Sequence, residues 1–204
     1  ARSRWHVTPP APLHRFAPSE MLIAQLAART RRCLVEPELR PSAVAILLAE
    51  RDAAAGDLWV PLIVRPADAP THSGQIALPG GGVHPGDGNF GVTAQREAFE
   101  ELGVPTTTID VLGMLDDVPT PAGYCITPVL CAFSPHPFAP DAREVASYFW
   151  APVSLFADQA AAEFLGEREY RGVTYQMRAY HWHGHRIWGA TARILEQVAQ
   201  LALP

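Results

Sequence analysis

Apolar residues along the chain gather in short continuous runs, each bounded by proline, glycine or other turn residues. Apolar runs of this length, flanked by such breakers, predict buried β-strands. They occur at residues 42–50, 58–65, 76–78, 109–115, 124–133 and 145–150. Residues 173–182 instead alternate between apolar and polar positions, which predicts a strand that pairs with residues 168–171 as a hairpin.

Apolar positions at helical spacing occur in three other segments. Residues 19–34 are predicted to form a helix, with Ser19 as a possible N-cap. Residues 90–102 place small and apolar side chains on one face, and Gly103 follows as a natural helix stop. Residues 187–203 are predicted to form a closing amphipathic helix. This order of elements predicts an α/β fold in which a mixed β-sheet is sandwiched between α-helices (α/β/α).

A single domain accounts for residues 1–204, a length that can bury a substantial core. Residues 1–18 are rich in proline and polar residues, and we expect an N-terminal arm there. The core of the domain is expected at about residues 42–157, followed by a C-terminal hairpin and helix at residues 165–203. A monomer and a homodimer are both compatible with this organisation.

Charge and hydropathy argue against nucleic acid and membranes as partners. Acidic and basic residues are mixed along the chain with a net charge of −5, whereas nucleic-acid binders show a basic excess or stripe. The local basic run at residues 29–32 fits the solvated end of the first helix better than a phosphate-binding patch. No apolar run approaches the roughly 18–20 residues that span a bilayer.

Cysteine usage predicts a reducing compartment. Cys33, Cys125 and Cys131 cannot all pair, and none belongs to a Cys-x-x-Cys motif. Cys125 and Cys131 lie in a predicted strand, where a free thiol acts as a small buried hydrophobe. We therefore expect the protein in the cytoplasm.

Two polar clusters have competing interpretations. His181, His183 and His185 alternate, so on one strand they would share a face able to hold zinc. Solvent-facing histidines at a hairpin tip are the more common arrangement, and we favour it. Asp116 and Asp117 precede a Val-Pro-Thr-Pro segment and are interpreted as a turn cap.

Three glutamates on the predicted helix at residues 90–102 carry the candidate chemistry. Glu97, Glu100 and Glu101 are three or four residues apart, or adjacent, so they project from one helix face. An exposed acidic face is the simple alternative for such a cluster. Mg²⁺ prefers carboxylate oxygens and keeps waters that a substrate can replace, so a divalent ion would offset the repulsion. Arg96 can hold the carboxylates in place, and Gly80 and its glycine neighbours let backbone approach a ligand closely.

The whole string resembles the Nudix box. Residues 96–104 read Arg-Glu-Ala-Phe-Glu-Glu-Leu-Gly-Val, and Gly82 stands fourteen residues before Arg96, as that box requires. Gly88 occupies the position of the first box glutamate, with Asp87 beside it. The resemblance implies a Nudix fold and a hydrolase that cleaves a diphosphate with the help of Mg²⁺ or Mn²⁺.

Further segments are similar to the coenzyme A pyrophosphatases within that family. Residues 61–66 and the run His-Ser-Gly-Gln-Ile-Ala-Leu-Pro-Gly-Gly at 72–81 match in spacing, and residues 113–129 and 188–192 resemble later segments. The resemblance covers roughly residues 42–201. It departs from the subfamily pattern at Pro66, Pro70 and Leu78, which leaves Arg65 as the cation of the upstream stretch.

The resemblance assigns roles on the acidic helix and beyond it. Glu97 and Glu101 would bind the metal, Glu100 would be a further ligand or the base, and Arg96 would orient the glutamates. Glu144, expected at the start of a strand, is either a base or ligand or a plain surface carboxylate.

Substrate contacts are expected from the segment upstream of the helix. Arg65 is interpreted as a contact to substrate phosphate or as a strand-end surface charge, and His72 as a substrate contact or a structural hydrogen-bond donor. Gln75, Gly80 and Gly81 complete the expected substrate-binding residues.

The substrate is expected to be a small nucleoside diphosphate derivative. The leading hypothesis is coenzyme A or an acyl derivative, cleaved to 3′,5′-ADP and a 4′-phosphopantetheine product. The alternatives are ADP-ribose, a dinucleotide or a similar diphosphate, and a non-catalytic module that binds a nucleotide. Retention of all three box glutamates favours catalysis over binding alone.

Overall fold

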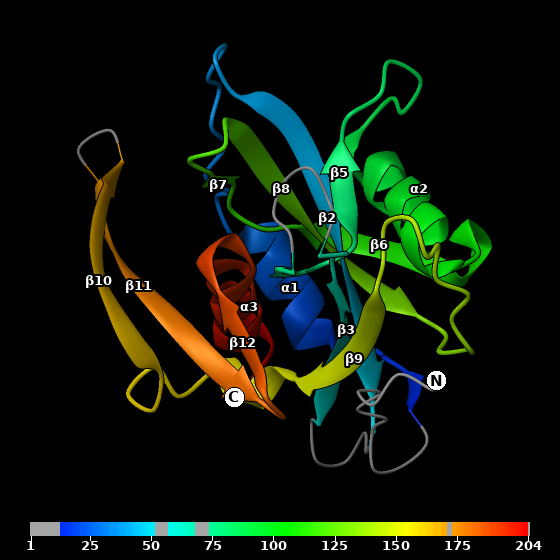
Figure 1. Ribbon diagram of the computed structural model, residues 1–204. Helices are drawn as coiled ribbons and strands as arrows, with labels where there is room; N and C mark the ends of the chain where they lie inside the picture. Colours follow the sequence, from blue (N-terminus) through cyan, green and yellow to red (C-terminus); the bar gives the residue numbers. More distant parts are fainter. Residues whose placement is uncertain (1–12, 52–56, 68–73, 171–172, 204) are drawn as a thin grey trace.

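A mixed β-sheet forms the centre of the computed structural model, which describes residues 13–51, 57–67, 74–170 and 173–203 (Figure 1). Its main path follows the order β4-β3-β2-β8-β6, and four short or edge strands pair alongside it. These strands are β1 (His14–Arg15), β2 (Arg40–Glu50), β3 (Leu58–Val64), β4 (Ile76–Ala77), β5 (Gly80–Gly82), β6 (Ile109–Met114), β7 (Val118–Pro119), β8 (Tyr124–Phe133) and β9 (Ser147–Pro152).

The long central strand β2 organises this sheet. Along its length β2 pairs in parallel with β8, and on its other edge it pairs antiparallel first with β5 and then with β3. The register places Ala43 opposite Gly81 and Val44 opposite Gly80. The glycine strand is therefore held against the centre of the fold, where its backbone position is fixed on one side by β2.

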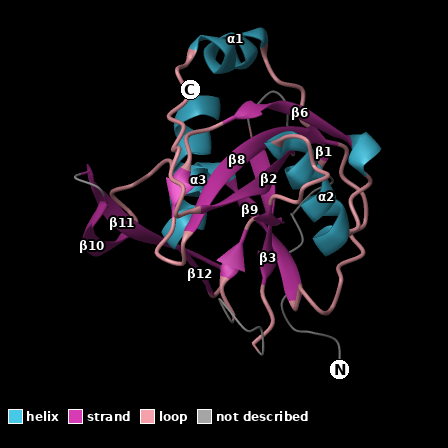
Figure 2. Ribbon diagram, turned by 90° about the horizontal axis from the view of Figure 1, so that it is seen from above, coloured by secondary structure: helices cyan, strands magenta, loops and turns pink. Residues whose placement is uncertain are grey.

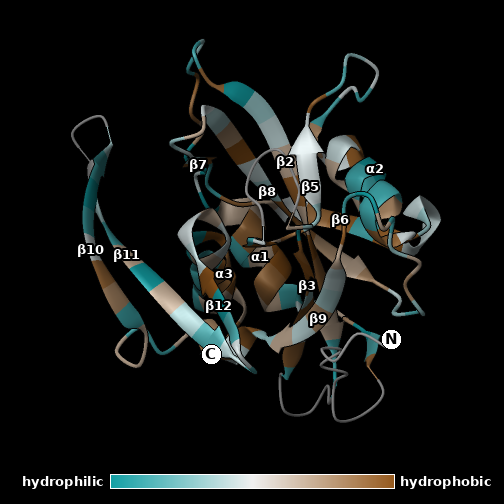
Figure 3. Cartoon of the chain, viewed as in Figure 1, coloured by the Kyte–Doolittle hydropathy of each residue, from teal (hydrophilic) through white to brown (hydrophobic). Residues whose placement is uncertain are grey.

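Helices cover both faces of the sheet, as the element order predicted. The helix α2 (Phe90–Leu102) packs Ala94 and Ala98 against one face of β2, and α3 (Gly189–Ala202) packs on the other face with α1 (Glu20–Ala28) beside it (Figure 2). Residues of β2 alternate between the two cores, with Leu47 on the α2 side and Ile46 on the α3 side. Figure 3 shows hydrophobic residues gathered where the sheet, α1 and α3 meet.

A second, three-stranded sheet consists of β10 (Glu163–Tyr170), β11 (Val173–Trp182) and β12 (His185–Trp188). The β10–β11 ribbon reaches away from the body of the molecule beside α3 (Figure 1). The hairpin predicted here is confirmed, although β10 is longer than residues 168–171. The last helix begins at Gly189 rather than at residue 187, because Ile187 pairs with Tyr180 of β11. Short 3₁₀ turns occupy Thr106–Thr108 and Val153–Phe156.

The predicted bounds of α2 are confirmed. The side chain of Asn89 caps its first turn by accepting a hydrogen bond from the amide of Val92 at 3.0 Å. Gly103 ends the helix with φ of +70°, a left-handed conformation that favours glycine. Local signals at both ends therefore fix the helix that carries the glutamates.

The prediction for the first helix is right at its start and wrong at its end. Ser19 is the N-cap, but the helix stops at Ala28 instead of residue 34. The following arginines leave helical geometry to reach β6 and the loop after it: Arg29 pairs with Asp116 at 2.7 Å, and Arg31 pairs with Asp117. The basic run is thus neither a solvated helix end nor a phosphate site, and the two aspartates serve as its partners rather than as a turn cap.

Part of the predicted N-terminal arm belongs to the folded body. His14 and Arg15 form β1, which pairs with Glu50 and Ala49 of β2. Phe16 is 5% exposed and lies in the core with α3. Residues 1–12 lie outside the described residues.

The described helices do not include one whose length and hydropathy would let it cross a membrane.

Candidate active site

Arg96 organises the acidic end of α2 through five hydrogen-bond acceptors. Its Nε and Nη2 donate to the two carboxylate oxygens of Asp87 at 3.0 and 3.1 Å, and Nη2 also donates to the carbonyl of Gly82 at 2.9 Å. Its Nη1 donates to Glu97 and to Glu100, each at 2.7 Å. These carboxylates raise the pKa of Arg96, so the guanidinium stays charged. Arg96 therefore fixes two glutamates relative to the glycine strand.

Asp87, next to the position of the first box glutamate, pairs with Arg96. It is buried and accepts hydrogen bonds from the amide of His84 at 2.9 Å and the hydroxyl of Thr93 at 2.8 Å. These bonds, and above all those from Arg96, hold the pKa of its carboxyl well below its usual range. Gly88 has φ of +71°, which strains any residue with a Cβ. The loop thus presents its carboxylate from position 87 rather than 88.

The glycine strand β5 lies directly against the glutamate side chains. A Cβ added to Gly81 would stand 2.5 Å from Oε1 of Glu97, and one added to Gly80 would stand 2.5 Å from the carbonyl of Ala43. The amide of Gly80 donates to Oε2 of Glu101 at 2.9 Å. In the structure these glycines closely approach two glutamates and β2, while their predicted approach to a ligand stays a prediction.

Glu97 and Glu101 are buried carboxylates whose pKa is raised by burial, although Glu97 pairs with Arg96. Glu101 is 1% exposed, and burial raises its pKa to about 8 despite the hydrogen bond from Gly80. Burial also raises the pKa of Glu97, which is 7% exposed. The charge of Glu97 raises the pKa of Glu101 further, and the charge of Glu144 raises both. A cation at this point would lower the free energy of both ionised carboxylates.

Glu100 and Glu144 lie nearer the surface. The side chain of Glu100 is 46% exposed and shares Arg96 with Glu97. Glu144 is exposed and lies in a turn before β9, which starts at Ser147, so its predicted position at a strand start is wrong. Its amide instead closes a turn by donating to the carbonyl of Asp141 at 3.0 Å. The charge of Glu144 nevertheless acts on both buried glutamates, since it raises the pKa of Glu97 and of Glu101.

The donor set fits a divalent ion held by a pair of carboxylates. Over the described ranges, no group of three or more His, Cys, Asp or Glu side chains is arranged to hold a metal ion. Mg²⁺ commonly uses one or two carboxylates and completes its shell with waters and substrate phosphates. Glu97 and Glu101, buried side by side against β5, supply that minimal set, while Glu100 is engaged by Arg96.

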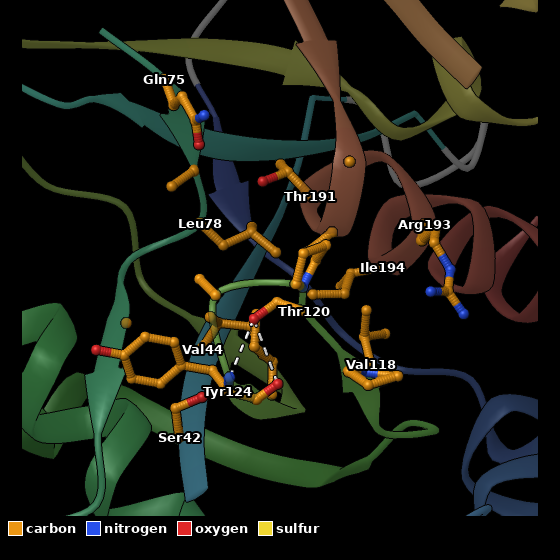
Figure 4. A pocket seen from close by; sticks show the side chains of 18 of the residues that line it. Ser42, Val44, Gln75, Leu78, Val118, Thr120, Tyr124, Thr191, Arg193 and Ile194 are labelled. Atoms are coloured by element: carbon orange, nitrogen blue, oxygen red, sulfur yellow. Dashed lines mark hydrogen bonds between the residues drawn. The ribbon is translucent and has the colours of Figure 1, made fainter. Parts of the chain in front are cut away.

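A cavity of about 670 Å³ opens on the other side of the glycine strand (Figure 4). Arg65, Gln75, Gly80 and Gly81, all predicted substrate contacts, line it. His72 lies outside the described residues. Arg65 joins the cavity to the acidic helix, because its Nη1 lies 3.9 Å from Oε1 of Glu101. Its Nε is buried without a hydrogen-bond partner in the described parts of the chain.

The remaining walls come from segments to which no site residue was assigned. They are the segment from Val118 to Tyr124, Tyr175 and Met177 of β11, and the segment from Trp188 to Ile194 at the start of α3. Two of these segments had shown resemblance to the coenzyme A pyrophosphatases at residues 113–129 and 188–192, which was the available signal. The sequence contained no such signal for Tyr175 and Met177, because they belong to the separate β10–β11 ribbon.

The three histidines do not form a zinc site. His183 has φ of +47° and makes the turn between β11 and β12 with Gly184. His181 lies 2.8 Å from Glu163, while His185 on the opposite strand stacks on Phe149 at 4.0 Å between ring centroids. The predicted hairpin tip is confirmed, although His185 faces inward rather than toward solvent.

Comparison with known proteins places the chain in a family. Residues 38–171 match the family model described as NUDIX domain, so the chain belongs to the Nudix family. It is an enzyme, a pyrophosphatase that hydrolyses the phosphoanhydride of a nucleoside diphosphate derivative.

Its relatives include bacterial Nudix hydrolases. The chain is 35% identical over 137 residues to the Nudix hydrolase NudL of Photorhabdus laumondii, covering 67% of this chain and 73% of that protein. It is 32% identical over 179 residues to NudL of Cronobacter sakazakii, covering 79% and 88%. The crystal structure of RenU, a Nudix hydrolase from M. smegmatis, aligns at 27% identity with a TM-score of 0.47, covering 58% of this chain and 74% of that one.

Proposed function

We propose that this enzyme cleaves the diphosphate of coenzyme A or its acyl derivatives, giving 3′,5′-ADP and a 4′-phosphopantetheine product. The observation that carries the proposal is the position of Arg65, which lines the cavity and lies 3.9 Å from Glu101. A diphosphate bound at this guanidinium would reach both the cavity and the acidic helix. The resemblance of residues 61–81, 113–129 and 188–192 to the coenzyme A pyrophosphatases selects this substrate among diphosphates.

The cavity suits a long substrate with apolar parts. Its volume of about 670 Å³ is within the range of ligand sites, roughly 300–1,000 Å³. Its walls combine aliphatic residues with the aromatic rings of Tyr124, Tyr175 and Trp188. No Asp or Glu is among the described residues that line it, so an anionic substrate meets no like charge there.

In this proposal Mg²⁺ or Mn²⁺ is held by Glu97 and Glu101, in line with the general use of divalent ions by Nudix hydrolases. When bound, the ion offsets charge on the diphosphate and lowers the pKa of water. The amide of Gly80 holds Glu101 in place, and Arg96 acts as a positioning residue for Glu97 and Glu100. Arg65 contacts a phosphate oxygen with its free donors.

The attacking water must lose a proton to a nearby base. Water oxygen bonds to one phosphorus, the bond from that phosphorus to the bridging oxygen breaks, and the other phosphate leaves with the bridging oxygen. We assign the proton to the carboxylate of Glu144, because it is exposed and its charge acts on Glu97 and Glu101. Glu100 is the other candidate, but its carboxylate is already paired with Arg96.

The state of the cysteines supports the cytoplasm as the site of reaction. Cys33, Cys125 and Cys131 are all free, and Cys125 and Cys131 are buried as predicted. Free thiols persist in reducing compartments.

The test is a substrate panel of coenzyme A, ADP-ribose, NADH and diadenosine polyphosphates, each with Mg²⁺, with Mn²⁺ and with EDTA. We expect the highest kcat/KM for coenzyme A, and loss of turnover with EDTA. Glu101→Gln should abolish turnover, whereas Glu169→Gln, an exposed residue of β10, should retain it. A higher kcat/KM on another diphosphate would refute coenzyme A as the preferred substrate. Turnover by Glu101→Gln would overturn the assigned site.

A further inference from the structure

Arg193 is a second cation that lines the cavity, and among the described residues it has no carboxylate partner. Its guanidinium lies over the ring of Tyr175, with 4.0 Å from Cζ to the ring centroid. In the part of the chain that the structure describes, it makes no ion pair. The nearest acid on the same helix, Glu196, is occupied by the hydroxyl of Tyr180 at 2.7 Å and by Arg178 at 3.8 Å.

The environment of Arg193 compensates its charge only in part. Burial lowers its pKa, and the charge of Arg32 lowers it further, while Tyr175 and Glu196 act in the opposite direction. A half-buried guanidinium in this state gains free energy from an anion that enters its surroundings. Arg193 and Tyr175 both line the cavity, and both also border a smaller pocket that contains Asp116, Asp117 and Glu196.

Arg193 lies far along the cavity wall from the acidic helix. Figure 4 shows it on α3, on the opposite side of the cavity from Gln75 and Tyr124. Arg65 belongs to the Gln75 side, because its amide donates to the carbonyl of Gln75 at 3.0 Å. The cavity therefore has a cation at each side, and Arg65 is the one next to the glutamates.

The first turn of α3, the helix that carries Arg193, is tied to the sheet. Thr191 is buried in the first turn of α3, and its hydroxyl donates to the carbonyl of Ile76 at 3.0 Å, which ties the helix to β4. Trp188, at the N-cap position, offers no side-chain cap, so the positive end of the helix faces the cavity that its first turn lines. The spacing between the two cations is thereby set by the fold.

We propose that Arg193, held by Tyr175, is a specificity-determining residue that binds a phosphate monoester remote from the diphosphate, namely a 3′-phosphate on the ribose. The proposal rests on the function proposed above, since it identifies the substrate class as nucleoside 3′-phosphate 5′-diphosphates. A guanidinium binds a phosphate through parallel N–H donors, and stacking on an aromatic ring holds the guanidinium in one orientation. Arg65 then takes the diphosphate and Arg193 the monoester.

Binding of products without metal tests the inference apart from catalysis. Titration calorimetry in EDTA compares adenosine 3′,5′-bisphosphate with AMP, which differ only by the 3′-phosphate. We expect the wild-type protein to bind the bisphosphate at least about 10-fold more tightly, the effect of one charge-assisted contact. Arg193→Gln should remove that preference and leave AMP binding unchanged. Arg193→Met keeps the apolar stem and serves as the second variant if the first is unstable.

The matched control is Arg168→Gln, which removes the same charge from an exposed position of β10 that does not line the cavity. It should retain the preference for the bisphosphate. Equal binding of both nucleotides by the wild-type protein, or an unchanged preference in both Arg193 variants, would overturn the inference. Turnover of coenzyme A is measured separately from nucleotide binding. If the enzyme turns over another substrate faster but still binds the bisphosphate more tightly through Arg193, only the proposed function is refuted.

Discussion

The buried carboxylate of Glu101 should make the metal-free protein less stable as the pH rises. Its pKa is raised from 4.5 to about 8 in the folded protein, so the folded state holds a proton that the unfolded chain has already released. An acid with a raised pKa therefore destabilises the fold progressively from the unfolded value upward, and the loss is complete above the folded value. Glu101→Gln removes this ionisation and keeps an oxygen for the amide of Gly80.

The magnitude follows from the two pKa values. Between pH 5 and pH 8.5 the ionisation of Glu101 removes up to about 4 kcal/mol of stability, at about 1.36 kcal/mol per pH unit. Relaxation of the protein and entry of water around Glu101 reduce this loss of stability, so we expect a loss of about 2 kcal/mol. Glu101→Gln should therefore match the wild-type protein near pH 5 and exceed its free energy of unfolding by about 2 kcal/mol at pH 8.5, in the same variant that loses turnover.

Urea unfolding in EDTA at pH 5, 7 and 8.5 measures these differences. The control is Glu169→Gln, which should change the free energy of unfolding by less than about 0.5 kcal/mol at each pH, because its side chain is exposed. Added Mn²⁺ should stabilise the wild-type protein at pH 8.5 and have little effect on Glu101→Gln. If Glu101→Gln is less stable than the wild-type protein at pH 8.5 without metal, the burial argument for Glu101 fails.

Two further substitutions test the contacts around the helix. Gly81→Ala would place a Cβ 2.5 Å from the Glu97 carboxylate, so we expect kcat/KM to fall about 100-fold. The control Gly86→Ala, whose Cβ meets nothing within 4 Å, should keep kcat/KM near the wild-type value. Equal rates in the two variants would contradict the contact between Gly81 and Glu97. Asp87→Asn should lower the free energy of unfolding by about 2 kcal/mol at pH 7 through weaker bonds to Arg96. Folding lowers the pKa of Asp87, so the stability difference between Asp87→Asn and the wild-type protein should shrink as the pH falls below 3.8, the ordinary pKa of an aspartate. A difference in urea unfolding that stays constant with pH would refute the ion pair.

Sequence-based prediction succeeded where the controlling interactions are local. The helix at residues 90–102 was predicted with its bounds, because Gly103 and the apolar spacing lie within the segment itself. It failed at the end of the first helix, because the competing partners are distant in sequence. Arg29 and Asp116 are 87 residues apart, and their ion pair replaces the predicted last turns of the helix. Periodicity within one segment contains no information on such a partner.

The cavity shows the same limit at the level of the site. Arg65 was predicted from its resemblance to a known segment, whereas nothing in the local pattern around Arg193 marks it as a ligand contact. The role proposed for it depends on the absence of a carboxylate partner among the described residues and on a tyrosine supplied by β11, and both are properties of the assembled fold.

The glycine strand and the acidic helix form one unit, which explains why their spacing in the sequence is informative. The glycines were interpreted as a place where backbone approaches substrate, but Gly81 is also required by the bulk of Glu97, and Gly80 holds Glu101 by its amide. A side chain at Gly81 would displace the very carboxylate that the helix presents. Because Arg96 also bonds to the carbonyl of Gly82, strand and helix can be matched only at one register. This contact requires a fixed number of residues between Gly82 and Arg96. The matching spacing therefore carried more structural information than either segment alone.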